Sequence, residues 1–178
     1  MQFKSTPDRY GAVAVLIHWL ATALIVALLA SGFRAASALD PMTKSALLRF
    51  HAVGGIAVLA LTLGRIAWWL FGDHKPLPVA GTASLLNRAA AAVHTLFYVV
   101  VLGMAASGIG MMVLSGAGVV LFGSAGGTLP DFWSYLPRIP HGLGARLFIA
   151  LLVLHIGGAL YHQFIRGDRL LARMGLGR

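Results

Sequence analysis

Two of the seven histidines, His141 and His155, bracket an apolar segment of the sequence at a spacing of fourteen residues. On an α-helix this spacing places the two side chains about 40° apart around the axis and about 21 Å apart along it. Two other histidines, His18 and His51, each lie inside a separate apolar run. An imidazole inside a membrane-spanning helix is costly and indicates a functional site by default. Two nitrogen ligands on one helix face, at two depths of a bilayer, are what a stack of two haems requires.

The composition indicates an integral membrane protein. The chain has 178 residues, of which 58% are hydrophobic and 11% are charged, whereas soluble domains carry about 25% charged residues. Four apolar runs are long enough to span a bilayer, and they cover residues 11–33, 47–71, 89–114 and 143–164. The absence of cysteine excludes disulfides, iron–sulfur clusters and covalently attached haem. We therefore predict an all-α fold, with a single membrane domain over residues 1–178 and four transmembrane helices in a bundle.

The basic residues indicate how the chain is oriented in the membrane. The formal net charge is +9, and the Lys and Arg residues lie at the ends of the apolar runs rather than in one patch. With the N-terminus inside, nine of the fourteen lie on the inner side and five on the outer side. Cytoplasmic loops carry the excess of positive charge, so we predict that both termini are cytoplasmic. The same distribution favours membrane lipid, and not nucleic acid, as a partner.

Depth in the membrane sorts the histidines into pairs. In this orientation His51 and His141 lie in the outer half, and His18 and His155 lie in the inner half. Each pair joins two different helices, as cofactor sites in helix bundles do. We therefore predict a bundle that encloses two non-covalent b-type haems, each with two histidines on its iron. His162 lies seven residues beyond His155 on nearly the same helix face, so depth alone leaves it open as the partner of His18.

Small residues follow the four histidines at the third position, namely Ala21, Gly54, Gly144 and Gly158. A small residue one turn along leaves room for a flat porphyrin, although small residues also serve the close packing of membrane helices. His94 and His162 have Phe97 and Ile165 at the same offset, and a hydrogen bond across a helix interface is an equally good interpretation of these two. Zinc or copper is a weaker alternative, because no carboxylate lies inside a span to complete a metal site. We find no internal repeat at a fixed period.

Three parts of the sequence together resemble the bacterial cytochrome b-561 family, whose members are small four-helix membrane proteins with two haems. They are Ile17-His18-Trp19-Leu20, His51 with its following glycine, and the stretch from His141 through His155 to the basic tail near Met174. The resemblance covers nearly the whole chain and implies a bacterial inner-membrane protein. It implies bis-histidine haem at His51 and His141. It implies the same at His18 and His155, and thus prefers His155 over His162.

Haem with two protein ligands has no open iron position, so such a site transfers single electrons. One short member of the resembled family oxidises superoxide at the outer face and reduces ubiquinone, which makes superoxide:ubiquinone oxidoreductase the sharpest hypothesis. Other short members serve hydrogenases and dehydrogenases, so an electron-transfer subunit with a redox protein as donor is the alternative. A small-molecule transporter is disfavoured because the residues at the midplane are apolar.

Candidate substrate residues lie at both ends of the predicted bundle. Arg49, Arg138 and Arg146 lie near the outer ligands and are candidates for attracting an anion such as superoxide. Pairing with haem propionates or lipid headgroups is the simpler interpretation for one or two of them. His162 and Trp19, near the inner end, are candidates for a quinone site, because a histidine that does not bind haem can exchange the proton that quinone reduction needs. A quinone site beside the outer haem is the alternative.

Overall fold

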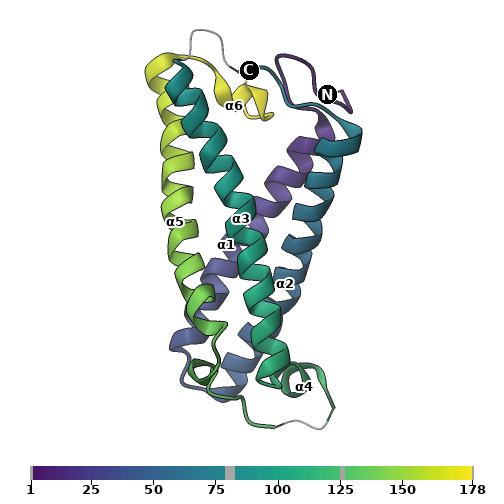
Figure 1. Ribbon diagram of the computed structural model, residues 1–178, viewed down its shortest axis with the longest axis vertical. Coiled ribbons are helices and arrows are strands. Elements are labelled where there is room, and N and C mark those ends of the chain that lie inside the picture. Colours follow the sequence, from purple (N-terminus) through teal and green to yellow (C-terminus); the bar gives the residue numbers. More distant parts are fainter. Residues whose placement is uncertain (1, 79–82, 125–126, 178) are drawn as a thin grey trace. The chain divides into compact units, whose positions relative to one another are not determined.

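The computed structural model describes residues 2–78, 83–124 and 127–177, and these residues form helices and loops without a β-strand. Four helices are long and apolar enough to cross a membrane, with mean hydropathies between 1.8 and 2.5 in their most apolar stretches. The prediction of an all-α fold with four potential membrane spans is confirmed (Figure 1). Arg178, one of the nine basic residues assigned to the inner side, lies outside the described residues.

The long helices are α1, α2, α3 and α5. Their bounds are Ala12–Ser37, Pro41–Ala67, Ser84–Leu114 and Arg138–Leu160, in that order. Two of them continue into a wider π-helical turn, which is Trp68–Gly72 after α2 and Tyr161–Arg166 after α5. The shorter elements are α4 (Ala117–Phe122), a 3-10 turn (Phe132–Ser134) and α6 (Leu170–Arg173). Large apolar side chains are exposed on all four long helices, as is expected where helices face lipid; examples are Leu16, Val53, Val113 and Val153.

The α2 helix begins before its apolar run, because polar and proline residues form its first turn. It begins at Pro41, and proline suits the first helical position because its missing N–H needs no partner there. The Asp40 carboxylate caps this turn by accepting hydrogen bonds from the Thr43 backbone N–H at 2.8 Å and the Thr43 hydroxyl at 2.6 Å. The bond from the Thr43 hydroxyl also holds the pKa of Asp40 below its ordinary value.

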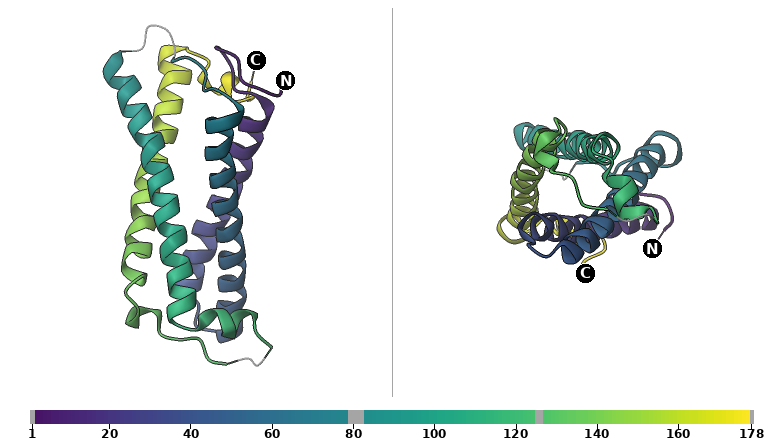
Figure 2. Two further views of the ribbon diagram at one scale, coloured as in Figure 1. Left: turned by 45° about the vertical axis from the view of Figure 1, so that its right-hand side comes forward. Right: turned by 90° about the horizontal axis from the view of Figure 1, so that it is seen from below.

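The helices contribute to two compact units, which are described separately. The first unit comprises Met1–Ala21, Leu61–Val99 and Phe148–Arg178, and the second comprises Thr22–Ala60 and Val100–Leu147. Each unit therefore contains one part of every long helix. In the second unit, Gly54 of α2 lies against Leu28 of α1, and Gly144 of α5 lies against Met104 of α3. Figure 2 shows these two helix pairs side by side.

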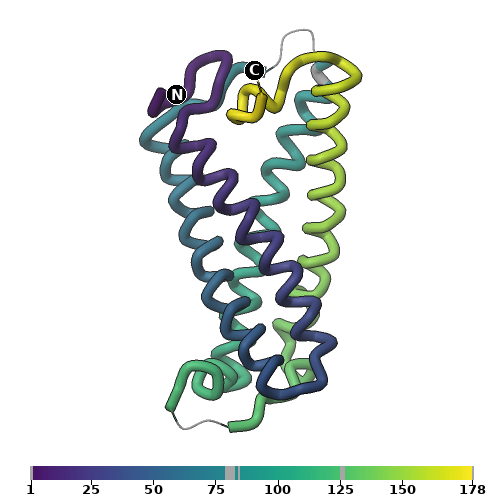
Figure 3. Tube along the Cα trace, turned by 180° about the vertical axis from the view of Figure 1, so that it is seen from behind, coloured from purple at the N-terminus to yellow at the C-terminus, as the bar shows by residue number. Residues whose placement is uncertain are grey.

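In the first unit, hydrogen bonds join the N-terminal segment, the segment after α2 and the C-terminal segment. Asp73 is 6% exposed, and its carboxylate accepts bonds from the Ser5 hydroxyl at 2.7 Å and the Trp68 indole N–H at 3.3 Å. The Arg173 guanidinium donates to three backbone carbonyls, those of Pro7, Asp8 and Leu77. Both ends of the chain therefore lie at the same end of this unit (Figure 3).

Candidate functional site

The second unit brings His51 of α2 and His141 of α5 together, as depth in the membrane predicts. The centres of the two imidazole rings are 6.0 Å apart, and the ring planes meet at 68°. Both side chains are partly buried between the helices. We call these two residues the His51–His141 pair.

The neighbouring α1 helix anchors the ring of His51. Its Nδ1 lies 3.1 Å from the Leu28 carbonyl oxygen and 3.3 Å from the Ser31 hydroxyl. The Ser31 hydroxyl itself donates to the same carbonyl at 3.1 Å. A carbonyl only accepts, so the bond to Leu28 requires the proton to be on Nδ1. The Nε2 atom then keeps its lone pair, which is the form of histidine that binds a metal.

The α3 helix anchors His141 in the same way. Its Nδ1 lies 3.0 Å from the Met104 carbonyl oxygen and 3.1 Å from the Ser107 hydroxyl. The Ser107 hydroxyl donates to the Met104 carbonyl at 3.0 Å. Both histidines of the pair are therefore held in one tautomer by a neighbouring helix, with Nε2 available as a ligand.

Sequence reasoning missed these serines, although a signal for them is present. His18 is followed after thirteen residues by Ser31-Gly32, and His94 is followed after thirteen residues by Ser107-Gly108. This His–Ser–Gly pattern recurs at an offset of 76 residues in α1 and α3. The sequence therefore contains a correspondence between these two helices that could have indicated the serines.

The glycines beside the His51–His141 pair differ from those that the sequence suggested. A Cβ added at Gly32 would lie 3.0 Å from the Cε1 atom of His51, and one added at Gly108 would lie 3.3 Å from Cε1 of His141. A Cβ at Gly54 or Gly144 would instead meet a side chain of the neighbouring helix at 2.9 Å and 2.8 Å, respectively. Close helix packing therefore explains Gly54 and Gly144, and the glycines that face the imidazoles are on the adjacent helices.

The first unit brings His18 of α1 and His155 of α5 together. The centres of their rings are 6.2 Å apart, and the ring planes meet at 59°. We call these two residues the His18–His155 pair. A guanidinium nitrogen of Arg65, from α2, lies 3.5 Å from the Nδ1 atom of His18.

His94 of α3, whose role the sequence left open, lies beside this second pair. Its ring centre is 5.3 Å from that of His155. Phe97, one turn further along α3, places its ring 5.5 Å from the His155 ring and perpendicular to it. His18 and His94 therefore both lie beside His155, so these three histidines form a cluster rather than an isolated pair.

The ring separations of the two pairs fit one iron between each pair of imidazoles. An imidazole nitrogen binds a metal at about 2 Å and the ring centre lies about 1 Å further back, so imidazoles on opposite sides of one iron have centres about 6 Å apart. The observed separations are 6.0 Å for His51–His141 and 6.2 Å for His18–His155. The 5.3 Å between His94 and His155 is shorter than this geometry requires. The pairs selected from the sequence therefore fit haem iron better than a pair that includes His94.

The three arginines predicted to attract an anion all belong to the second unit. Arg49 of α2 and Arg146 of α5 are exposed. The guanidinium carbon of Arg138, in the first turn of α5, lies 4.4 Å from the centre of the Trp133 ring. Such a cation–π contact restrains the side chain without removing its charge.

The two residues predicted for a quinone site both make hydrogen bonds in the first unit. The Nδ1 atom of His162 lies 2.5 Å from the Asp168 carboxylate, which also accepts a bond from Arg166 at 2.9 Å. The bond from His162 holds the pKa of Asp168 below its ordinary value. The indole N–H of Trp19 donates to the Met174 carbonyl at 3.1 Å.

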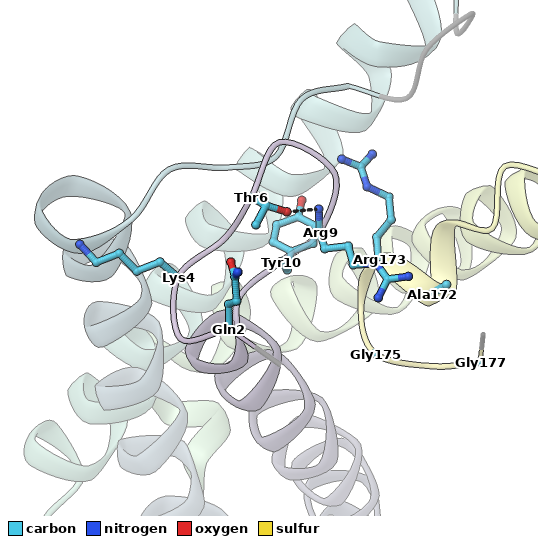
Figure 4. Close-up of a pocket in the computed structure, with 9 residues that line it drawn as sticks. All are labelled: Gln2, Lys4, Thr6, Arg9, Tyr10, Ala172, Arg173, Gly175 and Gly177. Carbon is cyan, nitrogen blue, oxygen red and sulfur yellow. Dashed lines mark hydrogen bonds between the residues drawn. The ribbon is translucent and has the colours of Figure 1, made fainter.

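A pocket of about 500 Å³ lies in the first unit between the N-terminal segment and the C-terminal segment around α6 (Figure 4). Three cationic side chains contribute to its wall, those of Lys4, Arg9 and Arg173. Neither His162 nor Trp19 lines this pocket. The pocket is therefore not formed by the residues that the sequence suggested for a quinone.

Comparison with known proteins shows that the chain is similar to cytochromes over most of its length. A protein-family profile described as prokaryotic cytochrome b561 matches residues 9–177. The chain is 27% identical over 184 residues to cytochrome b561 homolog 2 of Escherichia coli, an alignment that covers 98% of this chain and 95% of the relative. It is 29% identical over 171 residues to cytochrome b562 of Cereibacter sphaeroides, with 93% and 94% covered.

Proposed function

Since the chain belongs to the prokaryotic cytochrome b561 family, we propose that it carries electrons from superoxide to ubiquinone through two haems. As a member of this family, it is a multi-pass bacterial membrane protein that transfers electrons as a b-type cytochrome.

In this proposal the His51–His141 pair binds one haem through Nε2, and the His18–His155 pair binds the other. The observation that carries the assignment is the separation of the ring centres, 6.0 Å and 6.2 Å. Haem held by two imidazoles supplies one-electron oxidation and reduction, without an open position for oxygen. The chain's own contribution is to orient the imidazoles, since the α1 and α3 carbonyls fix the tautomers of His51 and His141.

We propose superoxide as the donor because of the charge around the His51–His141 pair. With both termini in the cytoplasm, this pair belongs to the outer half of the membrane, together with Arg49, Arg138 and Arg146. A cluster of cations raises the local concentration of a small anion and its rate of encounter. Each superoxide ion loses one electron and leaves as dioxygen, so no proton has to be supplied at this end.

The acceptor in this proposal is ubiquinone, near the His18–His155 pair. Reduction of a quinone to a quinol takes two electrons and two protons, so two superoxide ions are oxidised for each quinol. His162 is the candidate proton carrier, because its ring is hydrogen-bonded to the Asp168 carboxylate and a histidine that does not bind haem can exchange a proton. Trp19, whose indole bonds the C-terminal segment, offers an aromatic face for the quinone ring.

An assay of the purified protein tests this function directly. With superoxide generated in the presence of a soluble ubiquinone analogue, we expect quinol to form at a rate that depends on the cytochrome. Protein from which haem has been removed is the control. If quinol forms no faster than in that control, the superoxide:ubiquinone part of the proposal is wrong.

The alternative is an electron-transfer subunit of a dehydrogenase or hydrogenase. Such a subunit needs a polar face on which a partner docks, and the sequence assigns only Asp40 and Asp131 as acidic residues to the outer side. We therefore favour a protein that acts alone. Purification of the cytochrome with a stoichiometric soluble dehydrogenase would instead support the subunit.

The close approach of Gly32 to His51 leads to a test of the ligand geometry. In Gly32→Ala the new Cβ would lie 3.0 Å from Cε1 of His51, and relieving such overpacking costs about 1–3 kcal/mol. We expect the variant to lose haem to excess apomyoglobin faster than the wild type does. Gly55→Ala is the matched control, because a Cβ there meets nothing within 4 Å. Equal rates of haem loss in the two variants would contradict the proposed role of His51.

A further inference from the structure

Arg65 is a cation inside a membrane-spanning helix, and the apolar sequence around it offers no counter-ion. It lies near the end of α2, within the span Pro41–Gly72. A charged residue in this position is costly unless it is paired. All five acidic residues of the chain are aspartates, and each of them lies outside the four candidate spans. Both ion pairs found among the described residues are made by Asp168.

The guanidinium of Arg65 points at the His18–His155 pair but lacks a full set of partners. One terminal nitrogen lies 3.5 Å from Nδ1 of His18. The Nε atom is buried and has no hydrogen-bond partner within the described part of the chain. A buried donor left without an acceptor costs about 1–3 kcal/mol, and more when it is charged. The arrangement therefore calls for an acceptor that a bound group supplies.

The correspondence between the helix pairs gives a second reason to place Arg65 in this site. Arg65 follows His51 by fourteen residues, as His155 follows His141. The His–Ser–Gly pattern likewise makes His18 correspond to His94. The four corresponding positions converge, as shown by the contacts of Arg65 with His18 and of His155 with both His18 and His94. Arg65 of α2 therefore corresponds to His155 of α5, so the α1–α2 pair has an arginine where the α3–α5 pair has a histidine.

We propose that Arg65 binds a carboxylate of the haem at the His18–His155 pair, and that its charge gives this haem the higher midpoint potential of the two. The inference rests on the haem assignment proposed above. Haem b carries two propionate carboxylates, and a planar guanidinium binds a carboxylate through two parallel hydrogen bonds. The unpartnered Nε of Arg65 and a terminal nitrogen can form such a fork.

The effect on the potential follows from electrostatics. Oxidised haem carries one more positive charge than reduced haem, so a fixed cation nearby disfavours the oxidised form. In the His51–His141 pair, both Nδ1 atoms donate to backbone carbonyls. Such bonds raise the basicity of the ligand and favour the oxidised form. Electrons therefore pass downhill from the His51–His141 pair to the His18–His155 pair, where the quinone is proposed to react.

The test is a redox titration of purified holoprotein, monitored by the haem spectrum. In Arg65→Gln we expect the midpoint potential of one haem to fall while that of the other is unchanged. Arg65→Lys keeps the charge without the fork, so its potential should lie between those of Arg65→Gln and the wild type. Arg88→Gln, which removes an exposed arginine of α3, should leave both potentials unchanged. A redox-difference infrared spectrum should show shifted propionate bands in Arg65→Gln but not in Arg88→Gln.

The outcomes separate this inference from the haem assignment. His141→Leu should retain only the haem of the His18–His155 pair, and Arg65→Gln should shift the potential of that remaining haem. An unchanged potential, or a shift confined to the other haem, would overturn the role of Arg65. If Arg65→Gln loses this haem entirely, Arg65→Lys should still retain it, because lysine keeps the positive charge. Loss of the haem from both variants would mean that the positive charge at this position is not what holds the haem. A wild-type content other than two haems per chain would instead contradict the assignment itself.

Discussion

Replacing His141 with leucine is expected to lower the haem content of the purified protein from two per chain to one. Leucine keeps the helix apolar but offers no nitrogen to the iron, so the haem at the His51–His141 pair loses an axial ligand. His155→Leu should remove the other haem for the same reason. A pyridine haemochrome assay, set against the protein concentration, measures both losses. The haem that remains should still have the six-coordinate, low-spin spectrum of an intact pair.

His94→Leu is the matched control for these two variants. Its ring lies in the same cluster, 5.3 Å from the His155 ring, but it does not sit at the separation that one iron between two imidazoles requires. We expect this variant to keep both haems. Loss of one haem in His94→Leu, with two haems retained in His18→Leu, would mean that His94 is the ligand and that His18 has the structural role.

Reversing the charge of Arg49 or Arg138 is expected to slow the reduction of the haems by superoxide by about tenfold, since electrostatic steering changes encounter rates by about 10–10³. The spectrum of the haems should be unchanged, because in this proposal neither side chain is a ligand of the haem iron. The wild-type rate should fall with ionic strength, as exposed charges are screened over about 8 Å at physiological salt. Stopped-flow mixing with superoxide measures these rates.

Arg88→Glu is the control for charge reversal, because Arg88 is exposed at the start of α3 and is assigned to the opposite side of the membrane. Its reduction rate should match that of the wild type. If Arg138 paired with a haem propionate instead, Arg138→Glu would alter the spectrum or potential and the rate would not depend on salt. Arg138→Glu also removes the contact with Trp133, so Arg49→Glu, without that contact, distinguishes steering from a local rearrangement.

Most of the fold could be predicted because it depends on the hydrophobicity of continuous segments, which can be followed along the sequence. Four apolar runs predicted four membrane-spanning helices, and the helices of the structure contain three of those runs entirely and all but Gly11 of the first. Their ends could not be predicted as well, since the first turn of α2 is stabilised by the Asp40 cap and Pro41 rather than by hydrophobicity. Depth is also a one-dimensional property. It sufficed to match His51 with His141 and His18 with His155, whose rings do meet.

What the sequence alone determined is therefore the number and order of the apolar helices, and which imidazoles are predicted to pair by depth. The tertiary structure decided which atoms face those imidazoles: the Leu28 and Met104 carbonyls with their serines, and Gly32 and Gly108 in place of the glycines on the histidines' own helices. It also brought Arg65 to His18 across 47 residues of sequence. The physical reason is that contacts between helices depend on how each helix is rotated about its axis. That rotation is set by packing against its neighbours, and the spacing of residues along one helix does not contain it.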